Sequence, residues 1–205
     1  MRKTDIDQRS RDWHLLRWGK VTGTTLSSAI GTPAVQQTLL YDLVAARMVE
    51  PQITDLTSAA VTRGVELEPL ALKAATTATG IPFIQTGMLL SDSMAGFGMS
   101  PDAIYEENET VIGGIEIKCP GSKKHVEYLI KDELPKEYRA QVLAPFLLSD
   151  DVEWWYFASY DDRNYEIPLF LKRITRGDFP DIDEDRQKLI AFLCRVDDQH
   201  TRLTF

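Results

Sequence analysis

The chain has 205 residues, of which 43% are hydrophobic and 26% charged, so it can bury a core and is too hydrophobic for wholesale disorder. Its 23 lysines and arginines against 31 aspartates and glutamates give a formal net charge of −8, which argues against an indiscriminate nucleic-acid binder. A local basic track beside an acidic, cation-using site remains compatible with that charge.

Other broad classes are also disfavoured. Two cysteines are too few for a disulfide framework or a four-cysteine metal site. No apolar stretch approaches the roughly 20 residues needed to span a bilayer, and the first residues lack the apolar run of a signal peptide. We therefore expect a reduced, cytoplasmic protein that has no membrane association and forms one domain over residues 1–205.

The first part of the chain carries helical patterns. The spacing of its apolar residues predicts a helix over 10–18 that ends at Gly19, a short helix over 26–30 after a threonine-rich turn, and helices over 36–50 and 58–79. Within the last of these, Pro69 should break or kink the helix.

The pattern then changes to short runs rich in Ile, Val and Phe. Strands are predicted over 83–90, 97–99, 103–106 and 111–119, and the last two form an antiparallel hairpin around Asn108. A helix bent at Pro145 follows over 136–148, then strands over 152–160 and 165–174 and a closing helix over 181–196. This order predicts a layered α/β (α+β) fold.

The hairpin carries the residues most suggestive of chemistry. In the sequence Gly-Gly-Ile-Glu-Ile-Lys, alternation along a strand places Glu116 and Lys118 on one face, while Ile115 and Ile117 face the other way toward a core. Asp102 follows a proline and enters from the preceding strand. The alternative is that such a Glu-x-Lys pair lies on an ordinary solvated face.

Two carboxylates and a backbone carbonyl are hard oxygen ligands of the kind that Mg²⁺ prefers. A bound divalent ion makes a water nucleophilic near neutral pH, and a second ion can stabilise the leaving oxygen. A lysine beside that water would favour its deprotonated form. The trio of Asp102, Glu116 and Lys118 therefore suggests phosphodiester hydrolysis with Mg²⁺, for which Mn²⁺ is a possible substitute, and two ions are expected.

Taken with its flanks, the chain resembles the phage lambda exonuclease family, the YqaJ-type viral recombinases of the PD-(D/E)xK nuclease superfamily. The similar segments, in family order, are 16–24 (LRWGKVTGT), 63–68 (RGVELE), 100–102 (SPD), 116–120 (EIKCP), 140–142 (AQV) and 155–161 (WYFASYD). The resemblance implies a restriction-endonuclease-like core, in which helices flank a mixed central sheet.

The resemblance also implies roles for individual residues. Asp102, Glu116, the carbonyl of Ile117 and the helix glutamate Glu68 would hold the metal, and Lys118 would position the attacking water. Gln141 would help to arrange Lys118 and the site. The 5′-phosphate of the strand being degraded would be received by Arg17, Thr24 and Ser100, with Lys124 near the scissile phosphate. Thr24 stands where the family usually has serine, and Lys124 where it usually has arginine, so Lys124 loses the bidentate fork for phosphate.

Several of these positions have ordinary alternatives. Glu66 competes with Glu68 for the metal role, and Arg17 could pair with Asp12 on a helix surface. Thr24 and Ser100 could be simple helix caps, and Gln141 a surface residue. The three histidines are too scattered to propose as ligands.

The expected function is a Mg²⁺-dependent 5′→3′ exonuclease that acts on double-stranded DNA ends and leaves a 3′ single strand for phage-type recombination. The family also implies a homotrimeric ring around the DNA and cooperation with a phage single-strand annealing protein. The alternatives are an endonuclease or structure-specific nuclease of the same fold, or a catalytically inactive DNA-binding relative.

Overall fold

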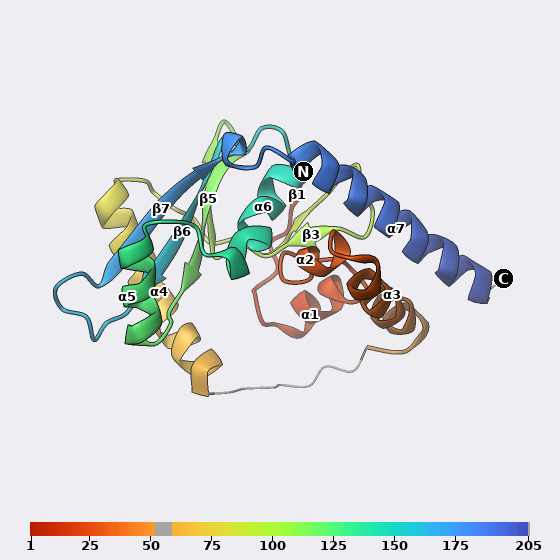
Figure 1. The fold of residues 1–205 in the computed structure, drawn as a ribbon, viewed down its shortest axis with the longest axis horizontal. Coiled ribbons are helices and arrows are strands. Elements are labelled where there is room, and N and C mark those ends of the chain that lie inside the picture. The colour runs from red at the N-terminus through yellow and green to blue at the C-terminus, as the bar shows by residue number, and fades with distance from the viewer. Residues whose placement is uncertain (52–58, 205) are drawn as a thin grey trace.

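The computed structural model describes residues 1–51 and 59–204 of the chain. A four-stranded sheet forms its centre, with helices on both faces and a further group of helices beside it (Figure 1). A smaller sheet, in the order β1-β2-β3, links the N-terminal residues to the segment before Asp102. Its strands are β1 (Arg2–Lys3), β2 (Leu89–Leu90) and β3 (Gly98–Met99).

The central sheet is mixed. Its strands lie in the order β4 (Ala103–Glu107), β5 (Thr110–Lys118), β6 (Trp154–Tyr160) and β7 (Leu169–Thr175). The β4–β5 and β6–β7 pairs are antiparallel, whereas β5 and β6 are parallel. The predicted β4–β5 hairpin is present, and its turn residues Asn108 and Glu109 have φ angles of 50° and 66°. A mixed sheet flanked by helices confirms the predicted fold class.

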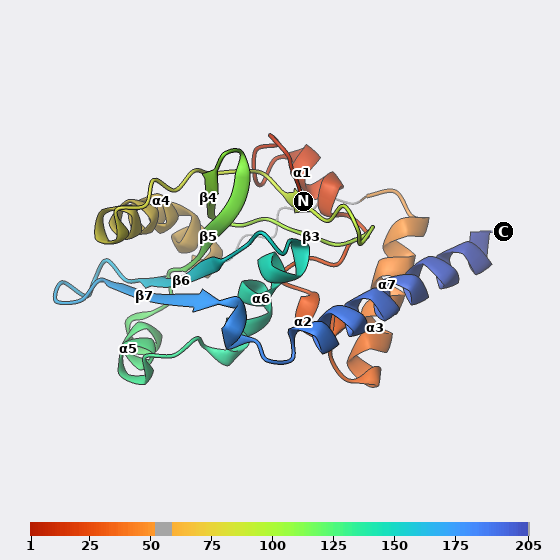
Figure 2. The ribbon, with the colours of Figure 1, turned by 90° about the horizontal axis from the view of Figure 1, so that it is seen from above.

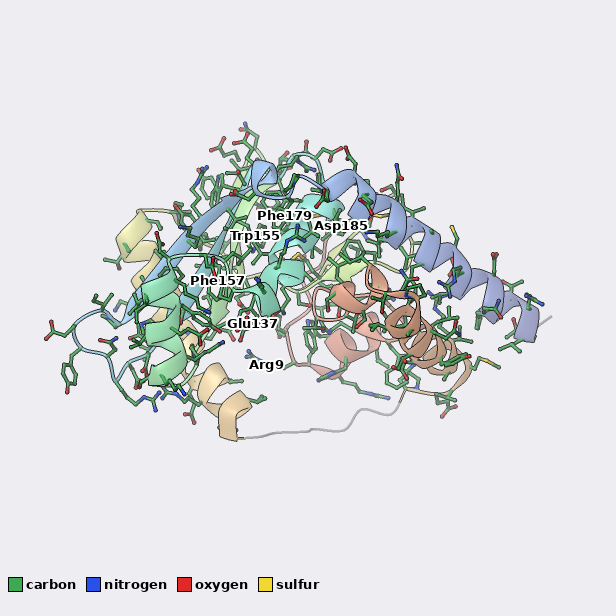
Figure 3. The ribbon with its side chains drawn as sticks, viewed as in Figure 1. Arg9, Glu137, Trp155, Phe157, Phe179 and Asp185 are labelled. Carbon is green, nitrogen blue, oxygen red and sulfur yellow. The ribbon has the colours of Figure 1, made fainter. Side chains whose placement is uncertain are left out.

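Each face of the sheet is covered by a different helix layer. Figure 2 shows α4 (Ala59–Thr79) on one side and α5 (Ser122–Lys131) and α6 (Arg139–Leu148) on the other. Small side chains of α4, Ala71 and Ala75, pack in one cluster with Ile115 and Ile117 of β5. The larger core cluster on the opposite side contains bulky rings such as Trp155, which Figure 3 labels together with Phe157. The strand β5 is therefore buried on both faces.

The remaining helices form the second group. These are α1 (Arg11–Arg17), α2 (Leu26–Ala29), α3 (Pro33–Met48) and α7 (Ile182–Thr204), with short 3₁₀ turns η1 (Lys136–Tyr138) and η2 (Arg176–Asp178). The first three were predicted, and α3 begins early because Pro33 suits the first helical turn. As predicted, α1 is followed by Gly19, which has a φ of 65°.

The strand predicted over 83–90 is mostly wrong. Only β2 and an isolated bridge between Ile84 and Ile104 have strand pairing there. The amide of Gln8 donates to the carbonyl of Thr86 at 2.9 Å, and Gly87 donates to the carbonyl of Thr4 at 3.2 Å. A side chain and a neighbouring loop thus satisfy backbone groups that a sheet ladder would otherwise occupy.

The helices also differ from expectation. Pro69 does not break α4, which continues through it to Thr79, whereas the predicted start at Ser58 lies outside the described residues. Proline has no N–H to donate to the carbonyl four residues earlier in the helix. That carbonyl belongs to the exposed Val65, so it can be hydrated. Helix α5 was missed because its fully buried residues are His125 and Tyr128 rather than aliphatic residues.

The closing helix α7 extends to Thr204, beyond the predicted end at Val196. Its extension carries no apolar stripe, and at the start of the extension Asp197 accepts a hydrogen bond from Arg47 of α3 at 2.6 Å. Within the described part of the chain, no helix combines the length and apolar content needed to cross a membrane.

Candidate active site

Asp102 and β5 meet at the start of the β4–β5 hairpin. Antiparallel pairing of Ala103 with Ile115 places Asp102, one residue earlier, beside the C-terminal end of β5. The Oδ2 atom of Asp102 accepts a hydrogen bond from the backbone N–H of Ile117 at 2.5 Å. The carboxylate is thereby fixed against the strand that carries Glu116 and Lys118.

Glu116 and Lys118 lie on the same side of β5 and contact each other. The Nζ atom of Lys118 donates to Oε1 of Glu116 at 2.5 Å. Glu116 is only 4% exposed, so a solvated strand face is wrong for this pair. Burial lowers the pKa of Lys118, but the attraction of Glu116 and Asp102 outweighs it, and the net pKa is raised. Lys118 therefore stays protonated in the folded chain.

The carboxylates around this point repel one another. Burial raises the pKa of Asp102 well above its usual range, and the negative charges of Glu116 and Glu68 raise it further, while Lys118 acts in the opposite direction. Such a set of hard oxygen donors fits a divalent cation, which would relieve the repulsion. No three His, Cys, Asp or Glu side chains among the described residues form a sufficient metal-binding group by themselves. The Ile117 carbonyl and water would have to complete the coordination of an ion.

Glu68 reaches this region from α4. It lines a cleft of about 380 Å³ together with Asp102 and Lys118, whereas its rival Glu66 is exposed. The Oε2 atom of Glu68 accepts a hydrogen bond from Arg9 at 2.5 Å, and Figure 3 shows Arg9 near the first turns of α4. The structure therefore places Glu68, and not Glu66, beside the hairpin carboxylates.

Arg17 and Ser100 form a second polar group next to the carboxylates. Ser100 Oγ accepts hydrogen bonds from Trp13 Nε1 at 2.8 Å and from Arg17 Nη1 at 3.1 Å. The Arg17 guanidinium also lies 4.3 Å from the centre of the Trp13 ring. Burial lowers the pKa of Arg17 and the charge of Glu116 raises it, so Arg17 lies within electrostatic reach of the hairpin. The alternatives of an Arg17–Asp12 pair and of a Ser100 cap are wrong.

The other expected residues are less closely connected. Thr24 is exposed and shares a 2.9 Å hydrogen bond with Thr22, just before α2. Gln141, at the start of α6, is half-buried, and no hydrogen bond joins it to Lys118 among the described residues. Lys124 Nζ lies 2.9 Å from Glu137 and is also paired with Glu127, so its charge is already balanced.

Arg9 and Tyr138 line the cleft and were not predicted as site residues. Arg9 has a φ of 67°, unusual for a residue other than glycine, and it lies in the turn that the Ser10 N–H closes on the Asp7 carbonyl just before α1. Tyr138 also lines the cleft, and the Lys118 ammonium lies 5.0 Å from the centre of its ring. In the sequence, Arg9 is only a basic residue that precedes the Ser10 cap, and this position does not indicate a contact with Glu68.

Residues 12–150 match the model of the YqaJ-like viral recombinase domain. The chain belongs to the YqaJ-like viral recombinase family. The match includes every candidate site residue named above except Arg9. A comparison with curated proteins gave no match.

Solved structures agree with membership of the YqaJ-like family. The chain is similar to an alkaline exonuclease, LHK-Exo, from Laribacter hongkongensis, with 31% identity and a TM-score of 0.83 over 95% of this chain and 96% of that one. A complex of LHK-Exo with dAMP gives the same values. A phage-related exonuclease from Haemophilus somnus, 13% identical with a TM-score of 0.64 over 93% of this chain and 99% of that one, shares the fold. The likeness to LHK-Exo extends well beyond Asp161, where the sequence resemblance ended.

Proposed function

We propose that the chain is a Mg²⁺-dependent exonuclease that degrades one strand of double-stranded DNA from its 5′ end. The product would be a 3′ single strand for phage-type recombination. Membership of the YqaJ-like family and the similarity to LHK-Exo, an alkaline exonuclease, support this activity. The complex of LHK-Exo with dAMP is in keeping with a deoxynucleotide product.

The observation that carries the proposal is that Asp102, Glu116 and Lys118 meet at the end of β5, where Asp102 and Lys118 line one cleft with Glu68. In this proposal Asp102, Glu116, Glu68 and the Ile117 carbonyl hold the cation, with Mn²⁺ as a possible substitute and room for a second ion. When bound, a divalent cation lowers the pKa of a water and offsets charge on the phosphate. The Lys118 ammonium, held protonated, orients the attacking water and favours its deprotonated form.

Arg17 and Ser100 would receive the terminal 5′-phosphate. The guanidinium and the hydroxyl are already held together, and the planar Arg17 side chain is supported by the Trp13 ring. A preordered guanidinium can give two parallel hydrogen bonds to phosphate at low entropic cost. In the same proposal Thr24 adds a hydroxyl, Gln141 helps to arrange Lys118, and Lys124 leaves its glutamate partners to approach the scissile phosphate.

Linear and closed substrates test this function directly. With Mg²⁺, the protein should release nucleotides from the 5′ end of a blunt duplex and leave covalently closed circular DNA intact. Cutting of the circle would favour the endonuclease alternative. Mn²⁺ binding without cleavage of either substrate would favour an inactive DNA-binding relative. Loss of nucleotides only from 3′ ends would contradict the proposed polarity.

If Arg17 binds the 5′-phosphate, the enzyme should prefer DNA ends that carry this group. The wild-type enzyme should act faster on 5′-phosphorylated than on 5′-hydroxyl duplexes, and Arg17→Ala should reduce this preference by roughly tenfold or more, because a charge-assisted hydrogen bond contributes about 1.5–3 kcal/mol. The rate on 5′-hydroxyl ends should change little. An unchanged preference in Arg17→Ala would remove Arg17 from end recognition.

Assembly and partners are also proposed on the family resemblance alone. A homotrimeric ring around the duplex would retain the substrate between cleavage steps, and a phage single-strand annealing protein would take over the 3′ strand. The mass of the protein in solution tests the first point. A monomer at working concentrations would contradict the ring.

A further inference from the structure

A buried carboxylate at the end of β6 joins the sheet to helix α4. Asp161 is fully buried, and its Oδ1 atom accepts hydrogen bonds from Arg63 of α4 at 2.9 Å and from Arg163 at 2.8 Å. The same Nη2 atom of Arg63 contacts Asp162 at 2.7 Å. A buried carboxylate is costly unless it is paired, so the pairing with Asp161 strongly favours a position of Arg63 at the end of the sheet.

The backbone of Asp161 is itself fixed. Its N–H donates to the carbonyl of Pro168 at 3.0 Å, and its carbonyl accepts a hydrogen bond from Asn164 at 3.1 Å. These bonds close the base of the loop between β6 and β7. Arg63 is therefore tied to a rigid point, in addition to its contact with the more exposed Asp162.

Glu68 lies between two attachments of α4. On its C-terminal side, Ala71 and Ala75 pack in one cluster with β5 and Leu72 packs against that cluster, but apolar contacts of this kind are not directional. Leu67 is buried next to it. On its N-terminal side, Arg63 is attached to Asp161, about 7.5 Å away along the helix axis at 1.5 Å per residue. The polar attachment supplies a directional restraint that the alanines lack.

We infer that the Arg63–Asp161 ion pair is a positioning device that sets the rotation of α4 and so holds the Glu68 carboxylate against the site of Asp102 and Glu116. Arg63 and Asp161 touch neither substrate nor cation in this role, and they act only through Glu68. Because Glu68 belongs to the proposed metal site, the inference rests on the proposed function.

Metal affinity provides the test. The Mn²⁺ dissociation constant of the full chain, measured by calorimetry without DNA, should rise roughly tenfold in Arg63→Gln, since outer partners of metal ligands typically contribute 10–100-fold. Arg163→Gln is the matched control. It removes the other guanidinium from the same carboxylate but does not belong to α4, so its Mn²⁺ affinity should equal that of the wild type.

A double-mutant cycle separates positioning from a general loss of structure. Glu68→Gln should itself weaken Mn²⁺ binding, and adding Arg63→Gln to it should change the constant by less than about twofold, the usual limit of additivity error. A further tenfold loss in the double variant would overturn the inference, as would wild-type affinity in either single variant. Should Arg63→Gln not fold, Arg63→Lys keeps the charge and should show a smaller shift in the same direction. Wild-type affinity in Arg63→Lys would then overturn it.

The two proposals fail in different ways. If the wild-type chain binds Mn²⁺ and degrades DNA while Arg63→Gln matches it, only the positioning role is lost. If the wild-type chain neither binds Mn²⁺ nor degrades DNA, the proposed function is lost and the positioning role with it.

Discussion

Lys118 has a structural role as well as the proposed catalytic one. Its ammonium pairs with a glutamate that is only 4% exposed, so truncation leaves a buried carboxylate without its partner. An unsatisfied buried group of this kind costs about 1–3 kcal/mol or more. A substitution that keeps a hydrogen-bond donor is therefore a better probe of chemistry than alanine.

We expect Lys118→Gln to lower the rate constant of hydrolysis by about 10²-fold or more, because general acid–base and orienting groups contribute on the order of 10²–10⁴. Chemical denaturation should show a smaller loss of stability for Lys118→Gln than for Lys118→Ala. Lys123→Gln, at an exposed lysine on α5, is the control and should match the wild type in both measurements. Near wild-type rates in Lys118→Gln would exclude Lys118 from the reaction.

At the scale of elements, the entry of β5 into the sheet depends on two glycines. An added Cβ at Gly113 or Gly114 would overlap the indole ring of Trp154 or Trp155, which face them across the parallel β5–β6 pair. Trp155 is fully buried and has no room to move. The glycines thus allow the parallel strands to approach while large rings fill both faces of the sheet.

Gly114→Ala should therefore destabilise the protein by about 1–3 kcal/mol, the usual cost of overpacking a core. Gly64 is the contrast, because an added Cβ there meets nothing within 4 Å and the residue lies inside α4. Gly64→Ala should raise stability by about 0.5–1 kcal/mol through helix propensity. Equal melting temperatures for the two variants would contradict this account of the glycine pair.

The buried carboxylate of Asp161, at the end of β6, should make stability depend on pH. Burial raises the pKa of Asp161, but hydrogen bonding and charge from Arg163 outweigh it, so the folded-state pKa lies below the ordinary value. Such a carboxylate contributes its full stability above the unfolded-state pKa of about 3.9 and loses it as pH falls through the folded value. The free energy of unfolding of Asp161→Asn should be lower than that of the wild type at pH 7, and the difference should shrink as the pH falls below about 4. A difference that grows on acidification would contradict the assignment.

The molecule as a whole is acidic, and the candidate site is acidic as well. The formal net charge is −8, and the charges of Glu116 and Glu68 raise the pKa of the buried Asp102. Two of the basic side chains near them are paired with these carboxylates, Lys118 with Glu116 and Arg9 with Glu68. The charge that first argued against nucleic-acid binding is thus compatible with a cation-dependent enzyme.

If Mg²⁺ binds the folded protein and not the unfolded chain, it should stabilise the fold. At 100 times its dissociation constant, a cation adds about 2.7 kcal/mol to the free energy of unfolding. We expect Mg²⁺ to raise the melting temperature relative to NaCl of equal ionic strength, and Asp102→Asn to lose most of this increase. The same increase in both proteins would mean that the ion binds elsewhere.

The sequence by itself determined the local features of this protein. Alternation along β5 placed Glu116 beside Lys118, Gly19 marked the end of α1, and Asn108 marked the hairpin turn, because each depends on neighbours only a few residues away. The prediction of one domain stays a prediction, as do the roles of the site residues.

Only the tertiary structure decided which distant groups meet. Arg9 and Glu68 are 59 positions apart, and Arg63 and Asp161 are 98 apart, so no periodicity of the sequence relates them. The choice of Glu68 over Glu66 followed from the rotation of α4 on the sheet. Helix α5 was missed because its buried residues, His125 and Tyr128, do not form an aliphatic pattern in the sequence. Local geometry fixes which side of a strand or helix a residue occupies, whereas the packing of whole elements fixes what it faces.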